Sequence, residues 1–441
     1  MHMSQQTTSS SRRQFLKLGV TAGMLSVAPF SLSAQTLNTT AHVVIMGVGA
    51  AGTAMANRLR KRLTGNKITL IGARKEHLYQ PGYTMIASGL WAPERVVSQT
   101  QDWLPNGVDW VAQDVKAVNA ETKSVTLEDG TTLSFDVLVV ATGCQLNYDQ
   151  IEGLTPDMIG SNGIGSVYAG PQGALKTSQQ IDAWLDSGQG RGIFTLPNTF
   201  LKCAGAPLKM TFTTLSRVEK RPEPNAFKVE FFTPYKDRVF SVPLYNQFVV
   251  ERWQQQGVDL HYSRILKAMD VAAKKAYFQQ EDGSLVEEAY DFIHVVPPMS
   301  APTAILESDL VWQEGPFANN WLEVDQFTLQ HRRFPNIFGI GDVIGVPLGK
   351  TAASVKLQAP VIEANLMAFL KGEELKASYN GYTSCPLITG IGKAILAEFG
   401  YNNVLLPSFS FIDPTEESWA VWVMEEQMLQ PAYNAMLSGR V

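Results

Sequence analysis

The sequence predicts an α/β protein with two Rossmann-like dinucleotide-binding domains and a C-terminal amphipathic segment. Three observations predict this class. A glycine-rich turn follows a β-branched strand near residue 47, two later apolar strands end in polar turns, and a long middle region opens on another apolar strand. The chain has 441 residues, 45% of them apolar, which is enough for two or more packed domains and excludes a disordered chain.

Composition also excludes several classes of partner. The 36 basic and 41 acidic residues give a net charge of −5, and no long basic run occurs, so no nucleic acid is expected to bind. Three cysteines are too few for a Cys₄ metal site but leave room for one redox pair. The six histidines show no metal-ligand spacing, so no metal is expected.

Residues 1–34 have the features of a twin-arginine signal peptide. Residues 11–17 (SRRQFLK) match the export motif, and Ser31, Ser33 and Ala34 offer a cleavage point. The alternative is a membrane anchor, but residues 18–32 are short of the roughly 20 apolar residues that a span needs. We therefore expect export to the periplasmic side of the inner membrane, with the mature protein bound peripherally.

The mature chain opens with a strand, a glycine-rich turn, a helix and a second strand. The strand is expected over residues 41–46, the helix over 53–63 and the second strand over 67–71. This order predicts a dinucleotide site, in which the helix N-terminus offers free N–H groups and a positive dipole end to phosphates.

The turn itself supplies the binding residues Gly47, Gly49, Ala50, Ala51 and Gly52. Gly47 permits the tight turn, Gly49 lets the backbone approach a pyrophosphate, and Gly52 lets the helix and strand pack closely. An acidic residue usually ends the second strand and binds the ribose, but Gly72 stands there in this chain. The sequence does not name a replacement for that acid.

Two later segments favour FAD over NAD. The apolar run 135–140 ends at Ala141, Thr142 and Gly143, and the run 335–340 ends at Gly341 and Asp342. Both resemble returning segments of flavoproteins with two dinucleotide domains, in which Asp342 would bind the ribityl chain of the flavin. Ordinary core strands would explain the apolar runs but not these paired endings.

The loop after Asp342 also belongs to the expected cofactor site. Lys350 and Thr351 open a helix, where a lysine and a helix N-terminus would stabilise negative charge on reduced flavin. A discontinuous FAD-binding domain is therefore expected over residues 41–155 and 305–375.

Residues 156–304 are expected to form the second Rossmann-like domain. Its opening strand, 192–196, is followed by bulky residues and prolines over 197–207 in place of a glycine turn. A nicotinamide dinucleotide is therefore not expected there, which disfavours a type-II NADH dehydrogenase. Electrons must enter by another route.

Two cysteine motifs make a specific resemblance. Residues 201–209 (LKCAGAPLK) and 381–389 (GYTSCPLIT) resemble the cysteine motifs of sulfide:quinone oxidoreductases, in the branch that includes the mitochondrial enzyme. The likeness extends from about residue 42 to the C-terminus. It implies a flavin disulfide reductase fold with non-covalent FAD, a disulfide between Cys203 and Cys385, and sulfide as substrate. It also implies a membrane quinone as electron acceptor and a small molecule as sulfur acceptor.

The chemistry of the two cysteines follows from thiol–disulfide exchange. Sulfide can attack one sulfur of a disulfide and leave a persulfide on one cysteine and a thiolate on the other. The family suggests Cys203 as the sulfur that carries the persulfide and Cys385 as the one that faces the flavin. Lys202 either lowers the pKa of its neighbour or points into solvent. The alternative is that both are buried, inert thiols.

Three further residues are interpreted as structural. No motif surrounds Cys144, and His294 lies in an apolar strand. His77 lies beside a tyrosine-proline motif and either lines the flavin pocket or packs, of which packing is favoured.

Residues 376–441 are expected to form a membrane-associated region that also contacts the quinone. An apolar face at helical spacing, interrupted by Pro431, predicts a helix lying in the membrane interface. It consists of Trp419, Val421, Trp422, Met424, Met428, Leu429, Tyr433, Met436 and Leu437. A core or dimer helix is the alternative, so a homo-oligomer stays open. Tyr382 and Phe399 are the candidate quinone-pocket residues.

Two rival functions share the fold. The flavin subunit of a flavocytochrome c sulfide dehydrogenase passes electrons to a haem partner and usually holds FAD through a cysteine thioether. Residues 79–85 contain no cysteine, which argues against that attachment. A non-catalytic sulfur carrier or redox sensor would need neither a complete cysteine pair nor Lys350.

Overall fold

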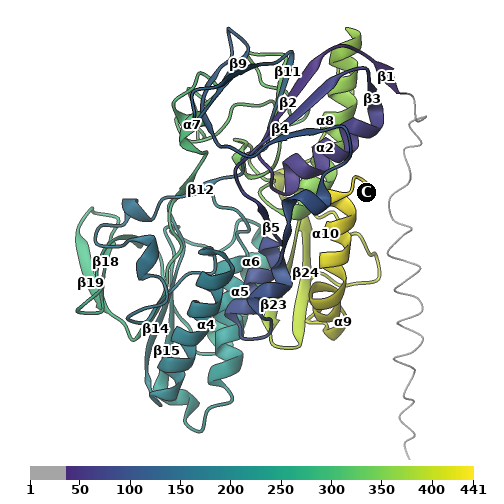
Figure 1. The fold of residues 1–441 in the computed structure, drawn as a ribbon. Coiled ribbons are helices and arrows are strands. Elements are labelled where there is room, and N and C mark those ends of the chain that lie inside the picture. The colour runs from purple at the N-terminus through teal and green to yellow at the C-terminus, as the bar shows by residue number, and fades with distance from the viewer. Residues whose placement is uncertain (1–35) are drawn as a thin grey trace, which may run out of the picture.

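The computed structural model describes residues 36–441, so the expected signal peptide at residues 1–34 lies outside the described residues. The structure has two α/β domains, of which the second lies in sequence between the two segments of the first, and the C-terminal elements lie beside their junction (Figure 1). The short strands β12 (Gln145–Leu146) and β21 (Met299–Ser300) pair where the chain crosses between the domains.

The first domain is built on a five-stranded parallel sheet in the order β22-β11-β2-β4-β7. The strands are β2 (His42–Met46), β4 (Lys67–Ile71), β7 (Asp109–Val111), β11 (Val137–Val140) and β22 (Ile337–Gly339). The central strand β2 is buried at four of its five residues, as expected for a parallel strand covered on both faces. The late strand β22 pairs with β11, which makes the domain discontinuous in sequence.

Helices α2 (Ala50–Arg62) and α8 (Ala352–Lys371) pack against each other in this domain (Figure 1). The helix α2 begins at Ala50, three residues before the expected start at Thr53, and ends at Arg62. The earlier start places Ala50, Ala51 and Gly52 in the first turn, where their N–H groups have no partner within the helix. Helix α8 begins after Thr351, whose hydroxyl accepts a hydrogen bond from the Ser354 N–H.

The second domain repeats the pattern with a five-stranded parallel sheet in the order β13-β20-β14-β15-β16. Its strands are β13 (Ile164–Gly165), β14 (Gly190–Thr195), β15 (Phe227–Phe232), β16 (Asp259–His261) and β20 (Phe292–His294). Its helices are α4 (Gly170–Asp186), α5 (Ala206–Val218) and α6 (Pro243–Gln255). The two Rossmann-like α/β domains predicted from the sequence are confirmed.

Smaller antiparallel elements complete the two domains. Strands β8 (Val115–Asn119), β9 (Ser124–Leu127) and β10 (Thr132–Ser134) form one sheet, and β17 (Ile265–Asp270), β18 (Lys275–Gln279) and β19 (Leu285–Ala289) form another. The remaining short elements are β1 (Leu37–Asn38), β3 (Leu63–Thr64), β5 (Glu76–Leu78), β6 (Val97–Gln99), α3 (Tyr83–Ala87) and α7 (Thr303–Leu306).

The C-terminal region consists of a hairpin and a broken helix. Strands β23 (Thr383–Gly390) and β24 (Lys393–Phe399) pair antiparallel, and α9 (Trp419–Val423) and α10 (Leu429–Leu437) flank a π-helical turn over Met424–Met428. Within residues 36–441, no helix has both the length and the apolar character needed to cross a membrane.

The structure corrects the prediction for the C-terminal apolar face. Val421, Trp422, Tyr433, Met436 and Leu437 are buried against the protein, and only Trp419 and Met428 of that stripe are largely exposed. The stripe is therefore mostly a core face, which was the alternative interpretation. Pro431 does not interrupt the helix, because it lies in the first turn of α10, where the N–H that it lacks is not needed. The break is the π-helical turn instead.

Candidate active site

The residues expected to bind the cofactor come together at one end of the first sheet. A Cβ on Gly47, whose φ is +109°, would lie 2.3 Å from the Ala141 carbonyl oxygen, and one on Gly52 would lie 1.7 Å from the Gly47 carbonyl oxygen. A Cβ on Gly341 would lie 3.3 Å from the Ala51 side chain. The glycine turn, the Ala141 turn and the Gly341 turn therefore meet around the start of α2.

These residues fit a bound dinucleotide. Gly49 caps α2 without a side-chain hydrogen bond, and the first turn carries no acidic residue, so nothing in the helix competes with an anion. The buried Thr142 hydroxyl has no hydrogen-bond partner among residues 36–441. It is free to bond a group that occupies the cradle.

Arg74 is a site residue that sequence reasoning missed. Its guanidinium would lie 3.5 Å from a Cβ on Gly49, which places a cation over the phosphate-binding turn. Gly72, two residues earlier, has no room for a side chain, since a Cβ there would lie 2.9 Å from both methyl groups of Val48. The acid expected at this position is therefore absent for steric reasons, and Arg74 is the charged group that the loop presents.

Lys350 is buried beside Asp342. Its ammonium donates hydrogen bonds to the carbonyl oxygens of Asp342 (2.7 Å) and Ile344 (2.6 Å) and lies 3.5 Å from the centre of the Trp321 ring. Burial lowers the pKa of Lys350 to about 7 and raises that of Asp342. Lys350 thus stabilises the turn that contains Asp342 by bonding two of its carbonyl oxygens. The contact with the flavin stays a prediction.

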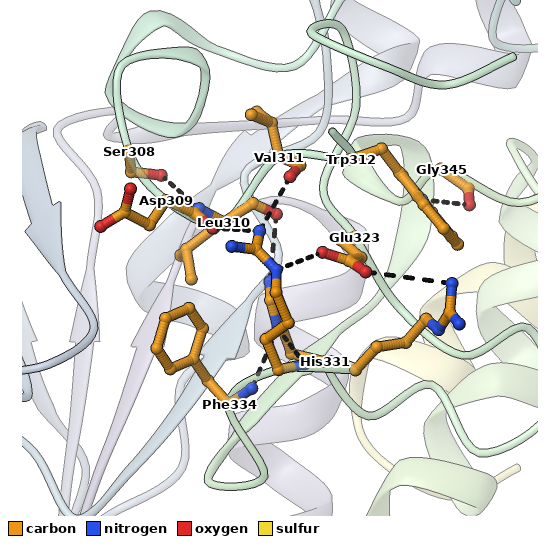
Figure 2. A network of polar contacts seen from close by, with 11 residues as sticks. Ser308, Asp309, Leu310, Val311, Trp312, Glu323, His331, Phe334 and Gly345 are labelled. Carbon is orange, nitrogen blue, oxygen red and sulfur yellow. Dashed lines mark hydrogen bonds and ion pairs between the residues drawn. The ribbon is translucent and has the colours of Figure 1, made fainter. Parts of the chain in front are cut away.

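A polar network holds the loops that lead into this turn (Figure 2). Arg333 donates to Glu323 (2.7 Å), and its backbone N–H donates to His331 (3.1 Å). The indole of Trp312 donates to the Gly345 carbonyl oxygen (2.8 Å), which ties the network to the segment between Asp342 and Lys350.

The two cysteines of the sequence motifs meet next to Lys350. Cys203 lies in the loop between β14 and α5, and its N–H donates to the Lys350 carbonyl oxygen (2.9 Å). Cys385 lies in β23, and its thiol hydrogen bonds with the Cys203 thiol. The two cysteines are 182 positions apart in sequence, and the packing of α5 on β23 brings them together. Thr351 and Thr383 also bond through their hydroxyls (2.9 Å), which fixes the start of β23 to the cofactor loop.

Gly205 makes this approach possible. A Cβ on Gly205 would lie 2.3 Å from the Cys385 sulfur, so any larger residue would displace that sulfur. Gly205 also caps α5, and its N–H donates to the Cys385 sulfur. A thiol at a helix N-terminus, with an N–H pointing at it, favours the thiolate.

The surroundings shift the pKa values of the two thiols in opposite directions. The Cys203 thiol donates a hydrogen bond to Cys385, which lowers the pKa of Cys385 to about 7, and the nearby ammonium of Lys209 lowers it too. The same hydrogen bond, together with burial, raises the pKa of Cys203. Cys203 adopts a φ of +47°, an uncommon backbone conformation for a residue other than glycine. The Tyr168 hydroxyl stabilises this conformation by donating a hydrogen bond to the Cys203 carbonyl oxygen (3.1 Å).

The structure contradicts one interpretation of Lys202. Its ammonium donates to the Gln80 side chain (2.9 Å), so it does not point freely into solvent. The buried lysine beside the cysteines is Lys209, one turn into α5, which sequence reasoning missed. Only its position six residues after Cys203, on the helix that follows, offered a signal.

The three residues interpreted as structural are Cys144, His294 and His77. Cys144 is half-buried near Asp342 and Lys350, and desolvation of its thiol raises its pKa to about 11, so it stays a thiol. His294 accepts a hydrogen bond from the Val167 N–H (3.1 Å), and His77 bonds the Tyr433 hydroxyl (2.7 Å). Both histidines are packed in the interior, and burial lowers the pKa of His294 to about 3 and that of His77 to about 4.

Tyr382 and Phe399 lie side by side near the open end of the β23–β24 hairpin. Thr383, next to Tyr382, pairs with Phe399, and the Tyr382 hydroxyl bonds the buried carboxylate of Glu398. Phe399 packs on Phe240 and Tyr245. A mostly apolar cavity of about 30 Å³ adjoins them and is lined by Tyr245, Leu396, Glu398, Leu405, Pro407, Phe409, Ile412 and Pro414. Among residues 36–441, no cluster of three or more histidine, cysteine or acidic side chains is arranged to hold a metal.

The fold and the site define a flavoprotein oxidoreductase of the flavin disulfide reductase class. Residues 41–176 match the family described as pyridine nucleotide-disulphide oxidoreductase. The mouse mitochondrial sulfide:quinone oxidoreductase is 33% identical over 405 residues, which cover 90% of this chain and 86% of the mouse protein. The Dictyostelium discoideum mitochondrial sulfide:quinone oxidoreductase is 32% identical over 406 residues, covering 92% and 87%.

The solved structure of the Aquifex aeolicus sulfide:quinone oxidoreductase has the same fold. It superposes with a TM-score of 0.75 at 19% identity and covers 90% of this chain and 92% of its own. The chain belongs to the sulfide:quinone oxidoreductase family, and it is an FAD-dependent enzyme that oxidises sulfide.

Proposed function

We propose that the protein oxidises sulfide through a disulfide between Cys203 and Cys385 and passes two electrons by way of FAD to a membrane quinone. The observation that carries the proposal is the contact between the two thiols beside the Gly205 N–H and the Lys350 loop. Family membership supports sulfide and quinone as the substrates, and it does not favour the flavocytochrome c alternative.

The first step opens the disulfide. HS⁻ attacks the Cys203 sulfur, forms an S–S bond to it and breaks the bond to Cys385, so the products are a Cys203 persulfide and a Cys385 thiolate. Cys385 suits the leaving role, because the Gly205 N–H and the Lys209 ammonium stabilise its negative charge. A thiolate or a second sulfide then takes the outer sulfur of the persulfide and leaves two reduced cysteines.

The reduced pair must lose two electrons before the disulfide can form again. FAD supplies the two-electron acceptor here and the link to a quinone. The chain's own contribution is to hold the two sulfurs together and to fix them, through the Cys203 N–H and Thr383, to the loop that carries Lys350 and Thr351. Tyr382, Phe399 and Glu398 are the proposed lining of the quinone site.

Anaerobic addition of sulfide to the purified yellow protein tests this function. We expect sulfide to bleach the flavin absorbance and a soluble quinone to restore it. NADH is expected to leave the absorbance unchanged, because the Cys203 loop occupies the place of a second glycine turn. Bleaching by NADH without bleaching by sulfide would contradict the proposal.

We further propose that the protein binds the membrane surface through the segment after β24. Large apolar side chains are exposed there, with Phe411 69% and Trp419 60% exposed. Val404, Leu405 and Met428 add to the same stretch of chain. Aromatic side chains of this kind favour the headgroup region of a bilayer.

Changing Phe411 and Trp419 to glutamate is expected to move most of the protein from the membrane fraction to the soluble fraction. The matched control is Leu285→Glu, which changes an equally exposed residue (57%) in the second domain and should leave partition unchanged. Equal partition of the two variants would contradict a membrane role for this segment.

We also propose export by the twin-arginine motif at residues 11–17. Recovery of the protein only from the cytoplasm would contradict that route.

A further inference from the structure

A buried ion pair lies beside the two cysteines, and the function proposed above uses only the charge of its lysine. Lys209 of α5 and Glu425 of the C-terminal π-helical turn bond at 2.9 Å, and their side chains are only 4% and 5% exposed. Burying two charges carries a large desolvation cost, and their mutual attraction rarely exceeds that cost by much. Stability alone therefore gives little reason for such a pair.

The ion pair lies one helical turn from the residue that contacts the Cys385 sulfur, and it has unused hydrogen-bonding groups. The Lys209 ammonium has three N–H groups, and the structure gives one of them a partner within residues 36–441, the Oε1 atom of Glu425. The Oε2 atom of Glu425 is buried without a partner among those residues. Lys209 begins the second turn of α5, and its N–H donates to the carbonyl oxygen of Gly205, the residue that contacts the Cys385 sulfur.

We propose that the Lys209–Glu425 ion pair is a positioning device that holds the sulfur of Cys385 as a thiolate. Lys209 supplies the positive charge, and Glu425 keeps that lysine protonated in a site where burial alone would favour its neutral form. The C-terminal turn is then part of the active site as well as part of the core. This inference rests on the proposed function, because it concerns the thiolate that opening of the disulfide releases.

The other groups around these residues do not supply the charge. Tyr168 and Tyr79 face the cysteines and the ion pair, and burial raises the pKa of both, so they stay neutral. The Cys203 thiol donates a hydrogen bond to Cys385, and its own pKa is raised. Lys202 bonds Gln80 instead. Lys209 is therefore the cation that acts on Cys385, and Glu425 is the anion that opposes it.

The test measures the ultraviolet absorbance of the thiolate against pH in holoenzyme reduced with a phosphine, with Cys385→Ser as the blank. The wild type is expected to form the thiolate with a midpoint near pH 7. Lys209→Met should raise the midpoint by roughly one to two pH units, since a neighbouring opposite charge shifts a pKa by about that much. At pH 7 this lowers the thiolate fraction by roughly five- to fifty-fold. Lys209→Arg, which keeps the charge, should stay near the wild type.

Two further variants separate this role from a structural one. Lys209→Met combined with Glu425→Gln leaves no unpaired buried charge, so this double variant is expected to fold even if Lys209→Met does not. Its midpoint should lie between those of the wild type and Lys209→Met. Arg191→Met, which breaks another buried ion pair in the second domain, should leave the midpoint unchanged. Equal midpoints in the wild type, Lys209→Met and the double variant would overturn the proposal.

The measurement needs no sulfide turnover, so the two proposals fail separately. Unchanged midpoints with normal sulfide oxidation would count against the ion pair alone. The predicted order of midpoints without sulfide oxidation would count against the proposed function alone.

Discussion

Replacing Gly205 with alanine is expected to slow sulfide oxidation by about 10²-fold, the usual cost of a misplacement of about 1 Å in an active site. Gly205 has φ −77° and ψ −14°, so alanine fits its backbone without strain. The added methyl group, however, would lie 2.3 Å from the Cys385 sulfur. The sulfur must turn away, and both its contact with Cys203 and its hydrogen bond from the Gly205 N–H are then lost.

The expected loss is specific to the reacting sulfurs. We expect the Gly205→Ala protein to fold and to retain FAD, since none of the cofactor residues contacts this methyl group. Gly390→Ala is the matched control on the same strand as Cys385, because its methyl group would meet only the rotatable hydroxyl of Ser216, at 3.0 Å. Steady-state rates with sulfide and a soluble quinone, set beside flavin content, check the prediction. Equal rates in the two variants would show that contact with Gly205 does not position Cys385.

Serine at either Cys203 or Cys385 is expected to reduce sulfide-dependent quinone reduction to the rate without enzyme. A hydroxyl can neither form the disulfide nor accept the sulfane sulfur, so each change removes the same step. Groups that act as a unit are not additive, and we expect the double variant to be no slower than either single one.

Cys144→Ser provides the control for this pair. Burial keeps the Cys144 thiol protonated, and we expect serine there to leave turnover close to that of the wild type. Turnover of more than a few per cent in Cys203→Ser or Cys385→Ser would show that sulfide reaches the flavin without the cysteine pair. Loss of activity in Cys144→Ser with normal folding would show a role for the third cysteine.

Much of the cofactor site follows from local sequence. A side chain on Gly47 would collide with Ala141, and one on Gly52 would collide with Gly47. A glycine-rich turn between a strand and a helix is typical of such close backbone contacts. Asp342 is predictable because it ends an apolar strand, and Lys350 because it opens the helix that follows. The structure adds that Lys350 bonds the Asp342 carbonyl oxygen, which no local pattern shows.

The features that sequence reasoning missed depend on contacts between distant segments. Lys209 and Glu425 are 216 positions apart, and nothing near either residue marks it as half of an ion pair. The C-terminal stripe has the spacing of an amphipathic helix, but the spacing does not show what covers the apolar face. Tyr433 of that stripe packs on His77 and Tyr79 rather than on a membrane.

The central claim is that sulfide opens a disulfide between Cys203 and Cys385. Peptide mass spectrometry of the oxidised protein, digested without reductant before and after one equivalent of sulfide, tests it most directly. The account predicts a peptide that links Cys203 to Cys385 before the addition, and a persulfide on Cys203 with an unmodified Cys385 thiol afterwards. Free thiols at both positions in the oxidised protein, or a linked peptide that sulfide leaves intact, would contradict it.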